Sequence, residues 1–388
     1  MIPHGESQEK ITAAGIIDAY KKMGYDAVAV GPLDLAAGAE FLKQQDKPAF
    51  PWISANLLNT DNHPVFPPFI IKQTGQSTTA IIGLTGAESL PANLHTGDWH
   101  TILPAQLQIL AKKCDHIILL SNLPEKENYE IAQQYPEIRI IISADPQFSN
   151  LSPVINNSTL ITQTAQQGKY LGRLDIEWGN TGKWESGLDQ LRGTNPKDTL
   201  PSTFVSHFTA LQSSLPKSSA VENIVSGIKQ QISRLNTAAP QTNSLQSATM
   251  IQDRQSVTGF TGFERCATCH RAQTDFWKST RHAGSYATLL KVGQANNLDC
   301  LPCHVTHDTP LFNKDPADMK QLLALPSSLQ TVGCEACHGP GKAHADTPQG
   351  IKPVRRADKT VCLHCHTVKR DTAFDYEKKI RLIQCPLD

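Results

Sequence analysis

The sequence has no excess of charge of either sign and no long apolar run. Its 388 residues include 36 Lys and Arg against 36 Asp and Glu, so charge gives no reason to expect a nucleic acid or an anionic membrane surface as partner. No apolar stretch approaches the roughly 18 residues of a transmembrane helix. Hydrophobic residues make up 39% of the chain, which excludes a wholly disordered protein. The length predicts two or three domains.

Cysteine and histidine, in contrast, are concentrated in the last third of the chain. Eight of the 10 cysteines occur in four copies of the pattern Cys-x-x-Cys-His. The copies comprise Cys266, Cys269, His270, Cys300, Cys303, His304, Cys334, Cys337, His338, Cys362, Cys365 and His366. This pattern is typical of c-type haem attachment, in which two thiols add to the porphyrin vinyl groups and the adjacent His becomes the proximal iron ligand. It predicts four covalent haem c groups.

Two alternatives use the same cysteines. Paired Cys-x-x-Cys units could form two zinc sites with four cysteines each, or the cysteines could form a disulfide framework. Neither explains why a His follows every second cysteine, so we favour haem and expect neither a zinc site nor a dinuclear metal site. Cys114 and Cys385 lie outside the pattern, and we interpret them as a buried thiol and a thiol near the end of the chain.

Haem c predicts an exported protein, because covalent haem attachment takes place outside the cytoplasm. We therefore expect a periplasmic, cell-surface or extracellular location. A secretory signal peptide has a charged segment followed by an apolar one. Residues 1–30 contain no such pattern. We expect that the signal peptide was cleaved or is not part of this sequence.

Four further histidines lie in the haem segment and match the number of sixth iron ligands. They are His282, His307, His344 and His364. Two His ligands on one iron give low-spin haem suited to electron transfer, with no open position for a substrate. Histidines from residues 1–258 or from another chain remain alternative sixth ligands.

Residues 259–380 resemble the tetrahaem cytochromes that accept electrons from hydroxylamine oxidoreductase. The resemblance is carried by residues 276–287, by the string Cys-Glu-Ala-Cys-His-Gly-Pro-Gly-Lys-Ala-His at 334–344 and by the closing residues 374–376. It implies that His282 and His344 are distal ligands, each of a haem other than its nearest one. The family has Thr-Gly after its second motif and one five-coordinate haem. Here the second motif is followed by Thr306-His307, so His307 and His364 are candidates for the remaining ligand positions.

Residues 1–180 alternate between helical and strand patterns, which favours an α/β domain. We expect helices at residues 8–23, 105–113 and 124–135, and strands at 26–30, 52–57, 69–72, 79–84, 116–121, 138–143 and 170–178. Residues 179–215 are poorly patterned, 221–235 predict an amphipathic helix, and 237–257 have the composition of a linker. The predicted domains are therefore 1–215, a helix and linker at 216–258, and a mainly helical and loop multihaem cytochrome c domain at 259–388.

The front domain also resembles the 5′-nucleotidase branch of the metallophosphoesterases. The matching stretches are residues 23–31, 50–56, 81–85, 115–121 and 168–174. The family's metal-ligand motifs are replaced here by residues 31–34, by Ser121-Asn122 and by residues 143–147, and its earliest motifs would precede Met1. A dinuclear phosphatase needs both metals to activate water and hold phosphate, so the resemblance implies a degenerate, inactive domain. Asp34 and Asn122 are expected to face each other across the former site, and residues 98–100 to form a polar loop.

Three functions follow from these features. The first is an electron carrier of extracytoplasmic, anaerobic or metal-reducing respiration, which is not an enzyme and whose front domain serves docking, shielding or assembly. Its partners would be redox proteins or extracellular acceptors, and dense haem spacing also allows copies to assemble into an oligomer or a filament with a continuous haem wire. The second is a redox enzyme acting on a nitrogen or sulfur oxyanion at a five-coordinate haem. The third, a phosphohydrolase with a cytochrome tail, requires the missing ligands. We favour the first.

Overall fold

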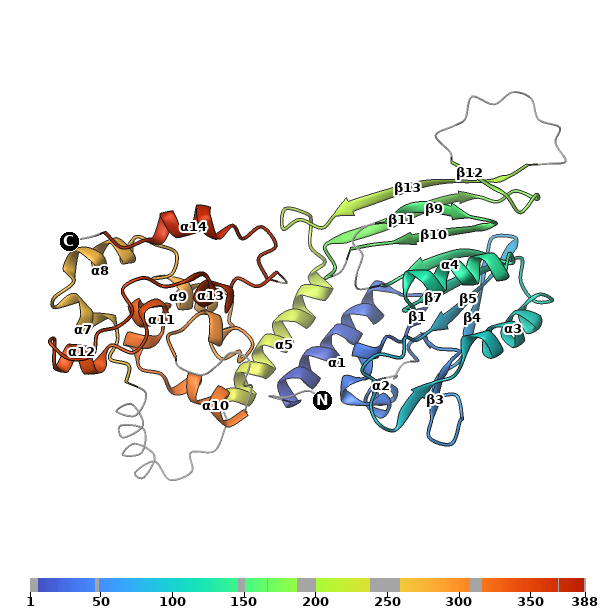
Figure 1. Ribbon diagram of the computed structural model, residues 1–388. Helices are drawn as coiled ribbons and strands as arrows, with labels where there is room; N and C mark the ends of the chain where they lie inside the picture. The colour runs from blue at the N-terminus through green and yellow to red at the C-terminus, as the bar shows by residue number, and fades with distance from the viewer. Residues whose placement is uncertain are drawn as a thin grey trace. The chain divides into compact units, whose positions relative to one another are not determined.

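The structure is a computed structural model that describes residues 6–45, 49–145, 151–165, 167–186, 200–237, 259–307, 316–368 and 370–386. It forms two compact units, Ile17–Val221 and Glu222–Asp388, and the second unit also includes the beginning of the chain up to Ile16 (Figure 1). The domain limits predicted from the sequence differ from this division, because they place the first helix wholly in the front domain and assign residues 216–258 to neither. No helix among the described residues is long and apolar enough to span a membrane.

A mixed six-stranded sheet forms the centre of the first unit, which confirms the predicted α/β class. The strand order is β4-β5-β7-β8-β10-β9, in which β5, β7, β8 and β10 are parallel and the edge strands β4 and β9 are antiparallel. The bounds are β4 Phe69–Thr74, β5 Ser77–Leu84, β7 His116–Ser121, β8 Ile138–Ser143, β9 Leu151–Asn156 and β10 Thr159–Gln163. The almost uniformly apolar β7 and β8 lie inside the sheet, as expected for strands covered on both faces.

Two helices cover one face of this sheet. Helix α3 (Trp99–Leu110) precedes β7 and helix α4 (Glu125–Gln134) precedes β8. Leu103, Leu107 and Leu110 recur at helical spacing and are at most 3% exposed, so they form one apolar stripe. They pack in a common core with side chains of the sheet such as Leu119.

A three-stranded sheet covers the opposite face. It contains β11 (Tyr170–Glu177), β13 (Ser202–Ala210) and β12 (Trp184–Ser186), in that order. Trp184 and Phe204 pack there against Ile140 and Leu160 of the central sheet. The front domain is therefore layered, with helices on one side of the central sheet and strands on the other.

Shorter elements complete the first unit. They are β1 (Val28–Ala29), the 3₁₀ helix η1 (Pro32–Ala37), α2 (Ala39–Gln44), β2 (Trp52–Ile53), β3 (Leu57–Asn59) and β6 (Leu94–Thr96). The single strand predicted at 52–57 is divided, because buried Ser54 and Asn56 bond to Thr85 rather than continue a ladder. The strands β9, β10, β12 and β13 were not predicted from the sequence.

The second unit consists of short helices and loops and includes the beginning of α1. Helix α1 spans Glu6–Met23 and helix α5 spans Ser219–Thr237, so both predicted helices are present. They are followed by α7 Phe263–Ala267, α8 Arg271–Lys278, α9 Ser285–Lys291, η3 Leu301–Cys303, α10 Pro316–Gln321, η4 Leu322–Ala324, η5 Ser327–Leu329, α11 Cys334–His338, α12 Lys342–Asp346, α13 Lys359–Leu363 and α14 Tyr376–Ile383. Most of the predicted linker, residues 238–257, lies outside the described residues.

The start of α1 is fixed in the second unit by a buried amide. Gln8 is 2% exposed. Its Nε2 donates to Asn297 Oδ1 and Asp299 Oδ2, both at 3.0 Å, and its Oε1 accepts from Asn236 Nδ2 of α5 at 2.9 Å. A buried amide with all these bonds satisfied orients the helix as well as anchoring it.

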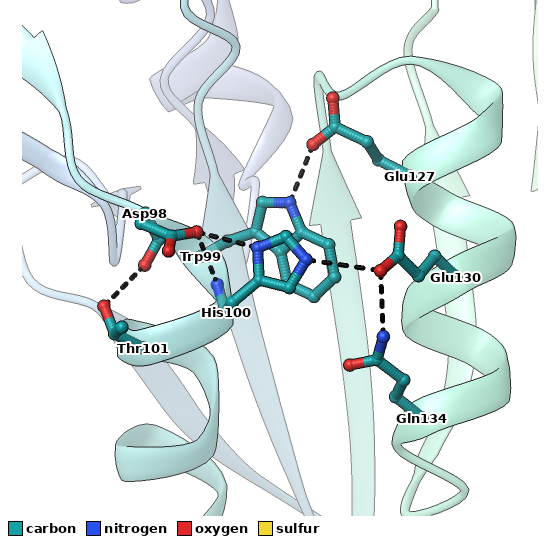
Figure 2. A network of polar contacts seen from close by, with 7 residues as sticks. All are labelled: Asp98, Trp99, His100, Thr101, Glu127, Glu130 and Gln134. Atoms are coloured by element: carbon teal, nitrogen blue, oxygen red, sulfur yellow. Dashed lines mark hydrogen bonds and ion pairs between the residues drawn. The ribbon is translucent and has the colours of Figure 1, made fainter.

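The residues predicted to form a polar loop at 98–100 instead begin helix α3 (Figure 2). Asp98 is the N-cap and accepts a hydrogen bond from the backbone N–H of His100 at 3.0 Å. This N–H group has no acceptor within the helix, so the cap satisfies it. The His100 ring lies between two carboxylates, with Nδ1 at 2.8 Å from Asp98 and Nε2 at 3.2 Å from Glu130 of α4. The prediction was wrong here because the capping residue and the ion pairs depend on a helix that starts earlier than its apolar pattern indicates.

We predict that this arrangement makes stability depend on pH. The hydrogen bonds to Asp98 and then to Glu130 raise the pKa of His100 above its usual value of 6.5. The stabilisation is therefore fully present below pH 6.5 and is lost as the pH rises through the raised pKa. The difference in thermal unfolding midpoint between the parent and His100→Gln should be larger at about pH 6 than at about pH 8.5. An equal difference at both pH values would contradict this prediction.

Candidate haem-binding site

Each Cys-x-x-Cys-His motif lies on a short helical turn of the second unit. The first motif ends at the start of α8, the second surrounds η3, the third forms α11 and the fourth begins in α13. The backbone N–H of the motif's His donates to the carbonyl of its first cysteine in the first and fourth motifs, at 2.9 and 3.0 Å for His270 and His366. One turn thus brings both thiols and the imidazole close together, as attachment to one porphyrin requires.

Three of the four predicted proximal histidines have one ring nitrogen engaged by the protein. His304 Nδ1 lies 2.8 Å from Ser285 O, His338 Nδ1 lies 2.6 Å from Val354 O, and His366 Nδ1 lies 2.8 Å from Asp371 Oδ2. An acceptor at Nδ1 fixes the tautomer that carries its proton there and leaves Nε2 for a metal. The donor set therefore fits haem iron.

Two pairs of imidazoles lie at a centroid separation suited to a shared metal. The ring centroids of His270 and His344 are 6.2 Å apart, and those of His282 and His366 are 6.3 Å apart. A metal bonded at about 2 Å to one nitrogen of each ring places the centroids about 6 Å apart. Each pair joins histidines of different motif regions, as the family resemblance implies for His282 and His344.

The two distal candidates also have the environment of ligands. His344 has a buried Nδ1 with no hydrogen-bond partner among the described residues, so the protein leaves a polar position of this ring unsatisfied. Burial, and then the nearby His366, lowers the pKa of His282. His282 is therefore held as the neutral imidazole, which is the form that binds iron.

The other two candidate ligands have different surroundings. His307 Nε2 lies 2.8 Å from the carbonyl oxygen of Pro302, which belongs to the second motif itself. His364 is exposed at the C-terminal end of α13.

Thiols of different motifs lie next to one another. A hydrogen bond joins Cys266 and Cys334 and lowers the pKa of the first while it raises that of the second. A similar bond to Cys365 lowers the pKa of Cys303 to about 6 and raises that of Cys365. The first motif is thus adjacent to the third, and the second to the fourth.

Burial, and then the nearby Cys362, raises the pKa of Cys337 to about 11. This effect of Cys362 indicates that the third and fourth motifs are also close. All four motifs therefore belong to one connected cluster.

Side-chain burial in this region fits a large apolar cofactor. Among the described residues from 342 to 386, no side chain is buried although three helices are present. Large apolar side chains in this part of the chain are strongly exposed, with Ile351 at 82%, Val368 at 82% and Leu382 at 67%. Folded segments seldom leave so much apolar surface in contact with water. A porphyrin would supply the missing core.

The string that carries the family resemblance is organised by one buried carboxylate. Glu335, which is 5% exposed, accepts the backbone N–H groups of Thr261, Gly262 and Gly341 at distances between 2.8 and 3.1 Å. A side chain at position 341 would meet Glu335 at 3.2 Å, which explains the glycine there. Several charge-assisted bonds hold the third motif against the segment that leads into the first.

Sequence reasoning missed the residues that orient the proximal histidines. Ser285 and Val354 act through backbone carbonyls, which no sequence pattern marks. Asp371 follows His366 by five residues, and Phe374 stacks on the His366 ring with centroids 4.4 Å apart. Only the short separation along the chain could have suggested Asp371.

In the first unit, polar groups that follow two neighbouring strands bond to one another. Ser54 Oγ lies 2.7 Å from Thr85 Oγ1, and Asn56 exchanges hydrogen bonds with the backbone of Thr85 at 2.8 and 2.9 Å. These groups lie at the carboxyl ends of β2 and β5, where open α/β sheets bind ligands. Each of these groups therefore has a hydrogen-bond partner within the protein.

Asp34 and Asn122 do lie together, beside Gly31. A Cβ at Gly31 would be 3.3 Å from an oxygen of each, and the Gly31 N–H donates to Asp34 at 2.8 Å. Solvent reaches Asp34, but the surrounding protein raises the pKa of its carboxyl through desolvation. Among the residues that the structure describes, no group of three or more His, Cys, Asp or Glu side chains could hold a metal ion. Pro146 and Gln147 lie outside those residues.

Comparison with known proteins agrees with the geometry of the second unit. Residues 265–339 match the family described as cytochrome c554 and c-prime. Cytochrome c-554 of Nitrosomonas europaea is 33% identical over 98 residues, which cover 21% of this chain and 39% of that protein. The chain thus matches well under half the length of this relative.

Solved structures similar to the chain include three hydrolases. A 5′-nucleotidase precursor from Thermus thermophilus has a TM-score of 0.44 and 20% identity, covering 56% of this chain and 46% of that one. The sulfate thiohydrolase SoxB of the same organism has a TM-score of 0.46 and 18% identity, covering 59% and 41%. The calcineurin-like phosphoesterase YfkN of Bacillus subtilis has a TM-score of 0.43 and 17% identity, covering 57% and 76%.

The match over residues 265–339 indicates the class of the C-terminal part. It implies a c-type cytochrome module with covalently bound haem iron that takes part in electron transfer. This part is mainly helices and loops, as predicted, and it is joined in one chain to a layered α/β domain.

We predict that His344→Ala leaves haem attachment intact, because the thioether bonds do not involve this residue. The haem of the first motif should lose its second imidazole and change from low spin to high spin. Electron paramagnetic resonance and visible spectra of the ferric protein would detect the change in one haem. Spectra identical to those of the parent would exclude His344 as a ligand.

Proposed function

We propose that the protein carries electrons through four covalent, mostly bis-His haems in extracytoplasmic respiration of the anaerobic or metal-reducing type. The observation that supports this most directly is the pairing of His270 with His344 and of His282 with His366 at 6.2 and 6.3 Å. Two imidazoles on one iron give a low-spin centre whose geometry changes little with oxidation state, which favours rapid electron transfer. The haem of the third motif would take His364 or a histidine of another chain.

The adjacency of the motifs supports a particular order of haems. The neighbouring cysteines join the first motif to the third, the third to the fourth and the fourth to the second. Because each porphyrin is attached at its cysteines, the haem edges at these positions would be close. The proposed path therefore runs 1–3–4–2, and assembly of copies into an oligomer or filament would extend it into a haem wire.

The front domain is proposed to serve docking, shielding or assembly rather than catalysis. Polar groups at the carboxyl ends of its strands are used in bonds to one another, as for Ser54, Asn56 and Thr85. Export to the periplasm, cell surface or exterior follows from the site of haem c attachment. Redox proteins or extracellular acceptors would then be the partners.

One contact bears on a second candidate function. His307 Nε2 is engaged by the Pro302 carbonyl of the second motif, so this ring could bind an iron only through Nδ1. A haem of the second motif with a single His ligand would be five-coordinate and could bind a small molecule such as a nitrogen or sulfur oxyanion. The protein would then be a redox enzyme, and binding of carbon monoxide to the reduced protein would distinguish it from a carrier with four closed haems.

We predict four thioether-linked haems per chain, because four complete motifs are present. The mass of the intact, exported protein and a pyridine haemochrome assay against protein concentration should both give this number. Replacing both cysteines of one motif by Ala should lower the number by one, and this variant provides the control. Clearly fewer than four haems in the parent would contradict the proposal.

We also predict that the full-length protein does not hydrolyse nucleotides or other phosphomonoesters. Pro32-Leu33, Asn122 and residues 144–147 replace the groups that would hold two metals. Phosphate release should equal that of a mock preparation with added manganese or zinc ions. Metal-dependent hydrolysis that disappears in Asp34→Ala and Asn122→Ala variants would refute the prediction.

A further inference from the structure

Two consecutive side chains with opposite charge contact different haem motifs. Arg370 Nη1 donates to Cys303 Sγ at 3.3 Å, and its Nη2 donates to Asp299 O at 3.4 Å. The next residue, Asp371, accepts the Nδ1 proton of His366 at 2.8 Å. A cation is therefore held at the second motif and an anion at the fourth, although the two residues are neighbours in sequence.

Asp371 gives His366 an environment that the other engaged proximal histidines do not have. His304 and His338 donate from Nδ1 to the neutral backbone carbonyls of Ser285 and Val354. A carboxylate accepts the same proton more strongly, so it makes the imidazole a better electron donor to iron. A stronger donor stabilises Fe(III) relative to Fe(II) and lowers the reduction potential.

The geometry keeps this hydrogen bond in place. Phe374 stacks on the His366 ring with an interplanar angle of 16° and a centroid distance of 4.4 Å. The carboxylate of Asp371 fixes one ring nitrogen at 2.8 Å. The stacked aromatic ring and the hydrogen bond together restrict rotation of His366.

Arg370 acts in the opposite sense at the second motif. A positive charge beside a haem favours the state with the additional electron, so it raises the reduction potential. Its side chain is exposed, and solvent screening makes its effect smaller than that of the direct hydrogen bond to His366.

Resting on the multihaem function above, we propose that Arg370 and Asp371 set the second haem above the fourth in reduction potential. Asp371 is a positioning and tuning residue that acts through His366, and it gives the fourth haem the lowest potential of the four. With haem bound at both motifs, this difference would favour transfer of one electron from a reduced fourth haem to an oxidised second haem, with no change in covalent bonds.

The test is a redox titration of the purified holoprotein and its variants, followed by visible and electron paramagnetic resonance spectra. Asp371→Asn keeps an acceptor oxygen for His366 but removes its charge. The lowest of the four potentials should rise, so that the Fe(III)/Fe(II) ratio of that haem at a fixed solution potential decreases by about tenfold, which is about 59 mV for one electron. The low-spin spectrum should be retained.

Two further variants separate tuning from general charge. Arg370→Gln should lower one of the higher potentials. The Fe(III)/Fe(II) ratio of that haem at a fixed solution potential should rise about threefold, which is a smaller effect than that of Asp371→Asn. Asp275→Asn is the matched control, because Asp275 is an exposed carboxylate of the same unit that contacts Lys278 and Arg271 but no His. It should leave all four potentials unchanged.

The outcomes are distinguishable. Four haems with unchanged potentials in Asp371→Asn would overturn the tuning and leave the proposed function standing, as would equal shifts of all four haems in Asp371→Asn and Asp275→Asn. Conversion of one haem to high spin in Asp371→Asn would assign a merely structural role to this residue and also overturn the proposal. Fewer than four haems in the parent would instead defeat the proposed function itself.

Discussion

The organisation of the second unit depends on the fact that an imidazole has two nitrogens with different roles. A proximal His can bind iron reliably only if its other nitrogen is engaged, because an unconstrained ring can rotate or change tautomer. The protein supplies the acceptors from the start of α9, from the segment after α12 and from the loop after the fourth motif, at Ser285, Val354 and Asp371. Regions distant from the motifs must therefore fold around them, and loops that have no apolar core of their own become parts of the site.

Local patterns predicted those parts of the fold whose side chains face one environment along their whole length. Strands β7 and β8 have the predicted bounds, because six consecutive residues in each are almost all apolar. Strands β9, β10, β12 and β13 were missed, since Ser, Thr and Gln interrupt their pattern and pairing with neighbours decides their structure. The parallel partner of Thr159–Gln163, for example, is β8, and no feature of its own sequence specifies that register.

The same distinction applies to the site. The four haem motifs could be found by inspection because each is complete within five residues. The proximity of the His270 and His344 rings joins residues separated by more than seventy positions, and spacing along the chain does not encode it. The resemblance to a family suggested distal ligands, whereas Asp371 and the role of Glu335 required coordinates. The string around the third motif is specific because the Glu335 carboxylate accepts three backbone N–H groups from two separate segments of the chain.

The bonds of Gln8 have a consequence for how the chain is made. Gln8 is synthesised long before its partners Asn236, Asn297 and Asp299, which follow it by 228 to 291 residues. The cytochrome module therefore cannot be completed as an independent C-terminal piece, and the first turns of α1 must wait for it. A fragment cut between the two units would lose a structural element of the module, so genetic separation of the domains requires a circularly permuted chain or addition of the N-terminal helix in trans.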